Sequence, residues 1–136
     1  MTAGHQPLIL IAEDDPDDAL MLKDAFGEIE HTAVTFLNNG KLLLEHVQEL
    51  LLNNKFPHLI VIDLNMPVLD GRSVIKILRN NAQTKNIPLI VLSTSKNKDD
   101  IDSVMALGAD DFYTKPASFS DLVNITSTIT HKWLNI

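Results

Sequence analysis

Carboxylates follow two short apolar runs of this 136-residue sequence, at the point where each run ends. Glu13 and Asp14 come directly after the run at 8–12, and Asp63 comes directly after the run at 59–62. Such short, unbroken apolar runs are typical of strands covered on both faces of a sheet. The carboxyl ends of parallel strands meet at one edge, where three carboxylates would repel one another unless a cation joined them. Mg²⁺ prefers such oxygen ligands, so the pattern predicts a magnesium site.

Two further polar segments stand at the ends of other strand candidates. Ser93 and Thr94 end the run that begins at Leu89, where a hydroxyl cluster is often only a turn or a cap. Lys115 and Pro116 follow a weaker strand candidate at 111–114, and a lysine there is often a solvated loop residue. Together with the acids, however, these groups would gather around one small volume. That combination suits phosphoryl transfer, in which a carboxylate attacks phosphorus and cations offset the charge on the phosphoryl oxygens.

The acidic segment at 13–18 contains further carboxylates with a simpler explanation. Asp15, Asp17 and Asp18 surround Pro16, which suits the first position of a helix. Acids gather at helix N-termini because they cap free backbone N–H groups and interact favourably with the helix dipole. We therefore assign these three acids to the start of a helix and not to the site.

The elements that must position these groups alternate along the chain. Strand-like apolar runs lie at 8–12, 34–37, 59–62 and 89–92, and 111–114 is a weaker fifth strand candidate. Helical spacing of apolar residues marks segments that begin at Pro16, at Lys41, near Val74, at Asp99 and at Ser118. Strands that alternate with helices predict parallel pairing through right-handed crossovers, with helices on both faces of the sheet. The expected fold is a doubly wound α/β domain.

Length and composition favour one domain with one core, since 45% of the 136 residues are hydrophobic. Cysteine is absent, which excludes disulfides, thiolate zinc sites and a cysteine nucleophile. A net charge of −7 with scattered basic residues disfavours nucleic-acid binding. The sequence shows neither a signal-peptide pattern nor an apolar stretch near the roughly 20 residues of a membrane span. We expect a cytoplasmic protein that binds neither membranes nor nucleic acid.

In type and order, these residues resemble the response-regulator receiver domains of two-component signalling over essentially all of 8–133. The resemblance implies a flavodoxin-like, five-stranded parallel sheet of order 2-1-3-4-5 flanked by five helices. It also implies a single receiver domain over 1–136, with no output domain. The motifs that carry it are Glu13-Asp14, Asp63-Leu64-Asn65-Met66-Pro67 with Asp70-Gly71, Ser93-Thr94 and Lys115-Pro116.

The resemblance assigns the acids to phosphoryl acceptance and metal binding. Asp63 would accept the phosphoryl group, and Asp14 and Asp63 would bind Mg²⁺. The backbone carbonyl of Asn65 would be a further metal ligand. Glu13 stands where many relatives have Asp, so it would reach the metal through its carboxylate or through a bound water.

The resemblance assigns the remaining residues to phosphoryl binding and to signalling. Ser93, Thr94 and Lys115 would bind phosphoryl oxygens, and a cis peptide bond to Pro116 would aim the lysine inward. Ser93 and Phe112 would couple phosphorylation to the surface formed by the fourth helix, the fifth strand and the fifth helix. Such coupling is a population shift between two conformations.

The implied partners are proteins. A sensor histidine kinase, of phytochrome or hybrid type, would supply the phosphoryl group, and a downstream phosphotransfer or target protein would receive the signal. A phosphorylation-dependent homodimer through the same surface is a further prediction. The chain would not be an enzyme in the usual sense, since it would catalyse only its own phosphorylation and slow dephosphorylation.

Three other interpretations use the same residues. A haloacid-dehalogenase-like phosphatase also forms an aspartyl phosphate with Mg²⁺, but that family requires Asp two residues after its nucleophile, where this chain has Asn65. A flavodoxin-like cofactor binder would fit the fold, although the acids after the first strand would repel a cofactor phosphate. A receiver that no longer accepts phosphate would be a binding module only, although the chemical residues are all present.

Overall fold

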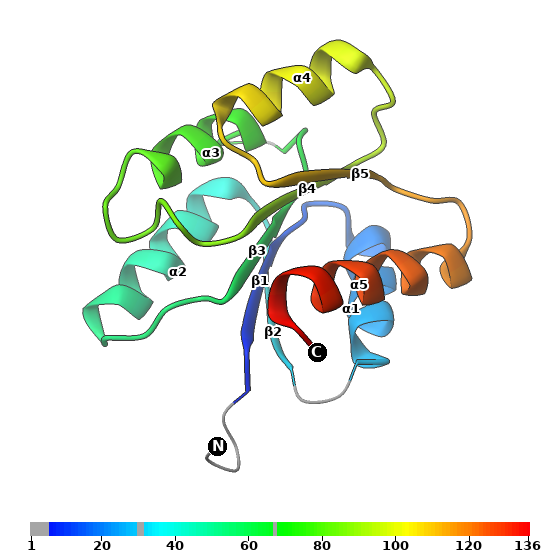
Figure 1. Ribbon diagram of the computed structural model, residues 1–136, viewed down its shortest axis with the longest axis horizontal. Helices are drawn as coiled ribbons and strands as arrows, with labels where there is room; N and C mark the ends of the chain where they lie inside the picture. Colours follow the sequence, from blue (N-terminus) through cyan, green and yellow to red (C-terminus); the bar gives the residue numbers. More distant parts are fainter. Residues whose placement is uncertain (1–5, 30–31, 67) are drawn as a thin grey trace.

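The apolar runs of the sequence form a parallel sheet that helices cover on both faces (Figure 1). The computed structural model describes residues 6–29, 32–66 and 68–136. Within these residues, five strands pair in parallel in the order β2-β1-β3-β4-β5, which confirms the predicted doubly wound sheet. The strands are β1 (Leu8–Ala12), β2 (Ala33–Leu37), β3 (Leu59–Ile62), β4 (Leu89–Ser93) and β5 (Asp111–Thr114).

A helix follows each strand and begins with a polar cap. The helices are α1 (Pro16–Gly27), α2 (Gly40–Leu52), α3 (Gly71–Arg79), α4 (Lys98–Leu107) and α5 (Phe119–Leu134). In each case, a side chain just before the helix accepts a hydrogen bond from a first-turn N–H group. These side chains are Asp15, Asn39, Asp70, Asn97 and Ser118. Because each cap follows the carboxyl end of a strand, polar groups accumulate along that edge of the sheet.

Successive residues of the central strands pack into two apolar layers, one on each face of the sheet. Leu10 and Ile60 contact the layer that α2, α3 and α4 cover, whereas Ile9 and Val61 contact the layer that α1 and α5 cover. Figure 1 shows this division of the helices between the two faces. Every residue of β3 and β4 is buried, so the residues that follow these strands start from fixed positions.

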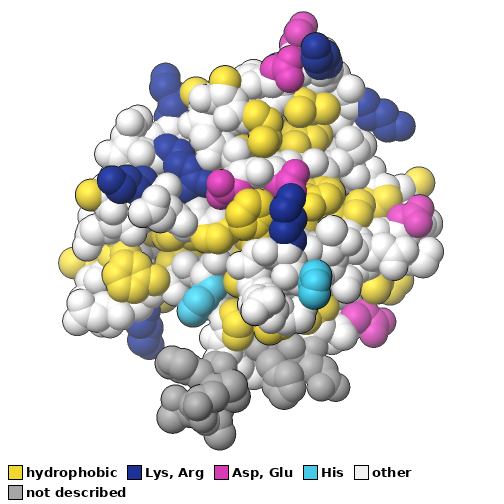
Figure 2. All heavy atoms as spheres, viewed as in Figure 1, with side chains coloured by type: hydrophobic (Ala, Val, Ile, Leu, Met, Phe, Trp, Pro, Cys, Tyr) yellow, Lys and Arg dark blue, Asp and Glu magenta, His cyan; other side chains and the backbone are white. Residues whose placement is uncertain are grey.

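The surface carries charges of both signs. Basic and acidic side chains are interspersed on the face shown in Figure 2.

Within 6–29, 32–66 and 68–136, none of the helices has the length and apolar composition needed to cross a membrane.

Candidate functional site

Strand pairing brings the acids of the first and third strands together. Ala12 pairs with Ile62, and the Asp63 N–H donates to the Ala12 carbonyl at 3.1 Å, so Glu13 and Asp63 both follow paired residues. Carboxylate oxygens of Glu13, Asp14 and Asp63 lie within 4.8 Å of one another. Glu13 is buried, Asp63 is half-buried and Asp14 is exposed. These three residues, here called the acid cluster, can therefore bind a metal ion that enters from the Asp14 side.

Lys115 extends from the end of β5 into the acid cluster. Its backbone N–H donates to the Ser93 carbonyl at 2.7 Å, which continues the pairing of β4 with β5 and sets where the side chain starts. Its Nζ lies 2.5 Å from Glu13 Oε1 and 3.1 Å from Asp63 Oδ2. The lysine side chain is only 12% exposed, so this ammonium belongs to the site and not to a solvated loop.

The expected cis peptide bond between Lys115 and Pro116 is wrong for this structure. Both residues are described, and the bond between them is trans. Trans is also the lower-energy isomer of an X–Pro bond, by about 0.5–1 kcal/mol. The side chain reaches the acids from a trans peptide because its hydrogen bonds to Glu13 and Asp63 hold it inward.

Burial, together with hydrogen bonds and neighbouring charges, sets the protonation equilibria around this ammonium. Burial raises the pKa of Glu13 from 4.5 to about 7, an effect that the hydrogen bond from Lys115 opposes and the charge of Asp63 increases. Burial also disfavours the charged lysine, but hydrogen bonds to Asp18 and Glu13 outweigh it and hold the pKa of Lys115 above its usual range. The two directions are compatible because several carboxylates share one ammonium, so the lysine gains more from pairing than each acid does.

Three other predicted site residues lie near the same edge with different contacts. Ser93 is fully buried at the end of β4, and its Oγ accepts a hydrogen bond from the Ser95 N–H at 3.2 Å. The Asn65 N–H donates to Asp63 Oδ1 at 3.3 Å, which ties this residue directly to the acid cluster. Thr94 is exposed to solvent. The roles assigned to Ser93, Thr94 and the Asn65 carbonyl stay predictions.

The predicted switch residue, Phe112, lies on β5 opposite Val91 of β4. It is half-buried and packs against the apolar layer under α2, α3 and α4. Two residues further on, Thr114 Oγ1 donates to the Ser95 carbonyl at 3.2 Å, which joins the end of β5 to the segment after β4. The ends of the two strands are therefore physically connected, while the switching role of Phe112 stays a prediction.

The segment after Asp63 is held tightly against the start of α3. The Gly71 N–H donates to the Leu64 carbonyl at 3.0 Å. A Cβ atom at position 71 would stand 2.8 Å from the Asp63 carbonyl oxygen, so a side chain there would push α3 away from the site. Pro67, which belongs to the same motif, lies outside the described residues.

One residue of the site, Asp18, was not predicted from the sequence. Asp15 caps α1 as predicted, because it accepts from the N–H groups of Asp17 at 2.8 Å and Asp18 at 3.2 Å. Asp18, which was assigned to the helix start alone, places Oδ2 2.8 Å from Lys115 Nζ. A usable signal was present, since side chains in the first turn lean toward the helix N-terminus and hence toward the edge of the sheet.

A second ion pair joins α3 to α4 near this edge. Arg72 Nη2 lies 2.7 Å from Asp100 Oδ1, and Arg72 Nε donates to Ser103 Oγ at 3.0 Å. The other oxygen of Asp100 accepts from Ser95 Oγ at 2.7 Å. The pair of Arg72 and Asp100 therefore fixes the segment after β4 to both helices, a connection that residue types alone did not indicate.

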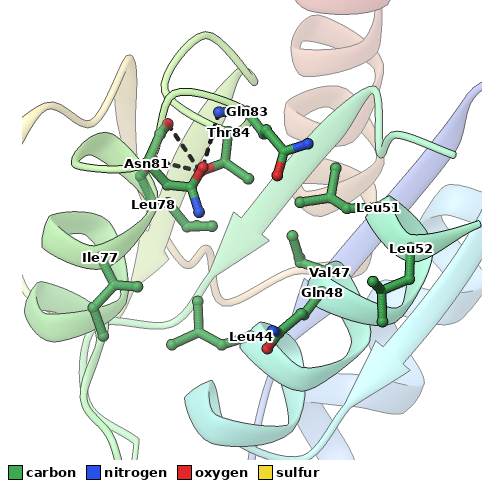
Figure 3. A pocket seen from close by; sticks show the side chains of 10 residues that line it. All are labelled: Leu44, Val47, Gln48, Leu51, Leu52, Ile77, Leu78, Asn81, Gln83 and Thr84. Carbon is green, nitrogen blue, oxygen red and sulfur yellow. Dashed lines mark hydrogen bonds between the residues drawn. The ribbon is translucent and has the colours of Figure 1, made fainter. Parts of the chain in front are cut away.

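A separate hollow of about 320 Å³ lies between α2 and the end of α3 with the segment that follows it (Figure 3). Apolar side chains such as Leu44, Leu51 and Ile77 line it together with the amides of Gln48 and Asn81. None of the acid-cluster residues contributes to its lining, so this hollow is distinct from the site.

The fold and the site together define a class of protein, namely a doubly wound α/β domain with an acid cluster and an inward lysine at the carboxyl edge of its sheet. The profile of the response regulator receiver domain family matches residues 9–127, and the chain belongs to this family. Members of the family are phosphorylated by histidine kinases and act on downstream targets.

Relatives match this chain over most of its length. It is 31% identical over 131 residues to Response regulator Rcp1 of Synechocystis sp., covering 93% of this chain and 88% of Rcp1. The crystal structure of the phosphorylated cyanobacterial phytochrome response regulator RcpA has a TM-score of 0.88 at 31% identity and covers 96% of this chain and 95% of RcpA. The Mn²⁺-bound form of Rcp1 has a TM-score of 0.80 at 30% identity and covers 94% of each chain.

Proposed function

We propose that Asp63 accepts a phosphoryl group from a sensor histidine kinase in a reaction that requires Mg²⁺. The observation that carries this proposal is the contact of Lys115 with Asp63, at 3.1 Å across 52 residues of sequence, beside two further carboxylates of the acid cluster. A nucleophile, a cation and a set of metal ligands thus converge at the edge where open α/β sheets bind their ligands.

The chain's own residues supply the acceptor and part of the charge stabilisation. One Asp63 oxygen forms a bond to phosphorus as the bond between phosphorus and the donor's imidazole nitrogen breaks, and the freed imidazole takes up a proton. A carboxylate needs no general base for this attack. The ammonium of Lys115 offsets negative charge on the phosphoryl oxygens, which is the main form of catalysis in such transfers.

The donor set fits a hard divalent cation. Glu13, Asp14 and Asp63 offer carboxylate oxygens within 4.8 Å of one another, and the backbone carbonyl of Asn65 is the fourth oxygen that we assign. Mg²⁺ bound there supplies positive charge that neutralises the acids and stabilises the transferred group. The raised pKa of Glu13 supports this assignment, because burial and then the neighbouring charge of Asp63 disfavour its ionised form, and a bound cation would offset both effects.

The signal leaves the site through the ends of β4 and β5. Ser93 and Lys115 are adjacent through the hydrogen bond from the Lys115 N–H to the Ser93 carbonyl at 2.7 Å. Contact of the Ser93 and Thr94 hydroxyls with the phosphoryl group then shifts the segment that Ser95 and Thr114 connect. Phe112 repacks in response, and the surface of α4, β5 and α5 changes for a target protein or a second copy of the chain.

The similarity to Rcp1 and RcpA supports a partner of the phytochrome type. RcpA is a phytochrome response regulator, and its structure matches this chain at a TM-score of 0.88. A kinase of that class is therefore the donor that we propose, acting on a cytoplasmic receiver.

The test is phosphorylation by acetyl phosphate with Mg²⁺, followed by intact mass measurement and a phosphate-affinity gel. The wild type is expected to gain one phosphoryl group, and Asp63→Asn and EDTA-treated wild type are expected to gain none. Asp17→Asn is the matched control, since it removes an exposed carboxylate that only begins a helix. Labelling of Asp63→Asn at the wild-type level would overturn the assignment of the acceptor.

A further inference from the structure

The hydrogen-bonding capacity of Lys115 is already filled. An ammonium has three N–H donors and no acceptor. Its three acceptors here are Glu13 Oε1 at 2.5 Å, Asp18 Oδ2 at 2.8 Å and Asp63 Oδ2 at 3.1 Å. If Lys115 donates to a phosphoryl oxygen, one of these three bonds must be given up first.

The three acceptors differ in how easily each can be released. The Glu13 side chain is 1% exposed, so without the ammonium its charge would be buried and unpaired. Asp63, at 12% exposure, stays within reach because the phosphoryl group is bonded to one of its own oxygens, and its other oxygen can still accept from the lysine. Asp18 is 35% exposed and lies outside the acid cluster, so water can replace the lysine at its carboxylate.

The local structure of α1 leaves Asp18 free for this contact. Asp18 is the third residue of the helix, where an acidic side chain usually turns back to the N–H group of the capping residue. Here the N–H of the capping residue, Asp15, donates instead to Glu13 Oε2 at 3.2 Å. Asp18 therefore has no capping function, and its carboxylate accepts a hydrogen bond from Lys115 instead.

We propose that Asp18 is a positioning residue that holds Lys115 in the unphosphorylated protein and releases it to a phosphoryl oxygen. The inference rests on the proposed phosphorylation of Asp63. Because Asp18 binds the lysine only in the unphosphorylated form, it shifts the equilibrium toward that form. Removing its charge while keeping its shape must then tighten the binding of a phosphoryl group or of a phosphoryl mimic.

The experiment measures the affinity of beryllofluoride, a phosphoryl mimic, by ¹⁹F NMR titration of the full chain. The proteins compared are wild type, Asp18→Asn, Asp18→Glu and Asp17→Asn. Calorimetry first gives the Mg²⁺ affinity of each protein, and every titration is then run at saturating Mg²⁺. Asp17→Asn removes the same charge from the same helix turn at an exposed residue, so it measures the general electrostatic effect.

We expect Asp18→Asn to lower the beryllofluoride Kd about three- to tenfold, the range for one charged hydrogen bond at a partly exposed site. Asp18→Glu keeps the acceptor and should bind within about twofold of wild type. Urea unfolding without Mg²⁺ should show that Asp18→Asn is less stable than wild type, so tighter binding cannot come from a generally stabilised fold.

Two results would overturn the inference while leaving the proposed function intact. In the first, the wild type binds beryllofluoride but Asp18→Asn binds equally or more weakly, which is expected of a purely structural ion pair. In the second, Asp17→Asn tightens binding as much as Asp18→Asn does, which is expected of unspecific charge repulsion. If the wild type itself binds no beryllofluoride with Mg²⁺ present, the proposed function fails and the inference fails with it.

Discussion

Two sets of charged side chains join distant segments at the carboxyl edge of the sheet. They differ in how far positive and negative charges balance and in how deeply the side chains are buried. Around Lys115, three carboxylates contact one ammonium whose side chain is 12% exposed. In the pair of Arg72 and Asp100, one cation meets one anion, with side chains 35% and 33% exposed. The first set keeps unneutralised negative charge and so favours a further cation. The second set is neutral and connects α3, α4 and the segment after β4.

The difference indicates which of the two sets of charged side chains can take part in chemistry. A buried, unbalanced set has perturbed protonation equilibria, as the raised pKa of Glu13 shows, and such sites are where function concentrates. A charge-balanced pair whose side chains are about one-third exposed is screened by water and contributes little beyond local order. Distance alone would not separate them, because both contain contacts of 2.7–2.8 Å.

Lys115→Ala should have the greatest consequence, because it removes the ammonium from the unbalanced set. We expect the rate of phosphorylation by acetyl phosphate to fall at least about 100-fold, the usual cost of losing one charge-stabilising donor. A time course of intact mass measures this rate, and circular dichroism checks the fold. Lys132→Ala is the control, since Lys132 pairs with Asp111 at 3.0 Å in an exposed place. A rate within tenfold of wild type would remove Lys115 from the mechanism.

The next effect concerns stability and pH in the absence of metal. The pKa of Glu13 is about 7 in the folded protein against an ordinary value of 4.5, so the folded state binds more protons between these values. The contribution of Glu13 to the free energy of unfolding is therefore fully present below about pH 4.5. It is lost as the pH rises to about 7, which lowers the free energy of unfolding by about 1–3 kcal/mol.

Urea unfolding in EDTA at pH 5.5 and pH 8 measures this loss. Glu13→Gln is the matched variant, because it keeps the size of the side chain and cannot ionise. The wild type should lose more stability than Glu13→Gln between the two pH values, and Mg²⁺ should reduce the difference at pH 8. Equal losses in the two proteins would show that the ionisation of Glu13 is not what lowers the stability.

The smallest effect is expected for Arg72→Ala, which removes the cation of the balanced pair. Because both side chains are about one-third exposed, unfolding free energy should fall by no more than about 1 kcal/mol, with the phosphorylation rate within about threefold of wild type. Urea unfolding and the same mass time course give the two quantities. A loss of rate as large as that of Lys115→Ala would end the distinction between the two sets.

Much of the fold and the candidate site was predictable because the signals are local. An unbroken apolar run such as 59–62 predicts a buried strand wherever it pairs, and the structure confirms that strand as β3. Asp15 before Pro16 predicts a helix start, and Asp15 caps α1. Glu13, Asp63 and Lys115 were found because each directly follows a strand, so parallel pairing brings them to the same edge.

The peptide before Pro116 and the partner of Asp18 were not predictable in the same way. Whether a peptide bond before proline is cis or trans depends on an energy difference of about 0.5–1 kcal/mol, which contacts elsewhere can reverse. Asp15 and Asp18 share one helix turn and one residue type, yet the first caps the helix and the second contacts Lys115, which is 97 residues away.

Strand positions, caps and the identity of the chemical groups follow from the chain itself, since each depends on neighbours a few residues apart. Which carboxylates share the single ammonium, and how far each is buried, depends on folding, because pairing strength and desolvation vary with separation and solvent access in three dimensions. The unbalanced charge at this edge therefore exists only once the ends of β1, β3 and β5 are brought together with the start of α1.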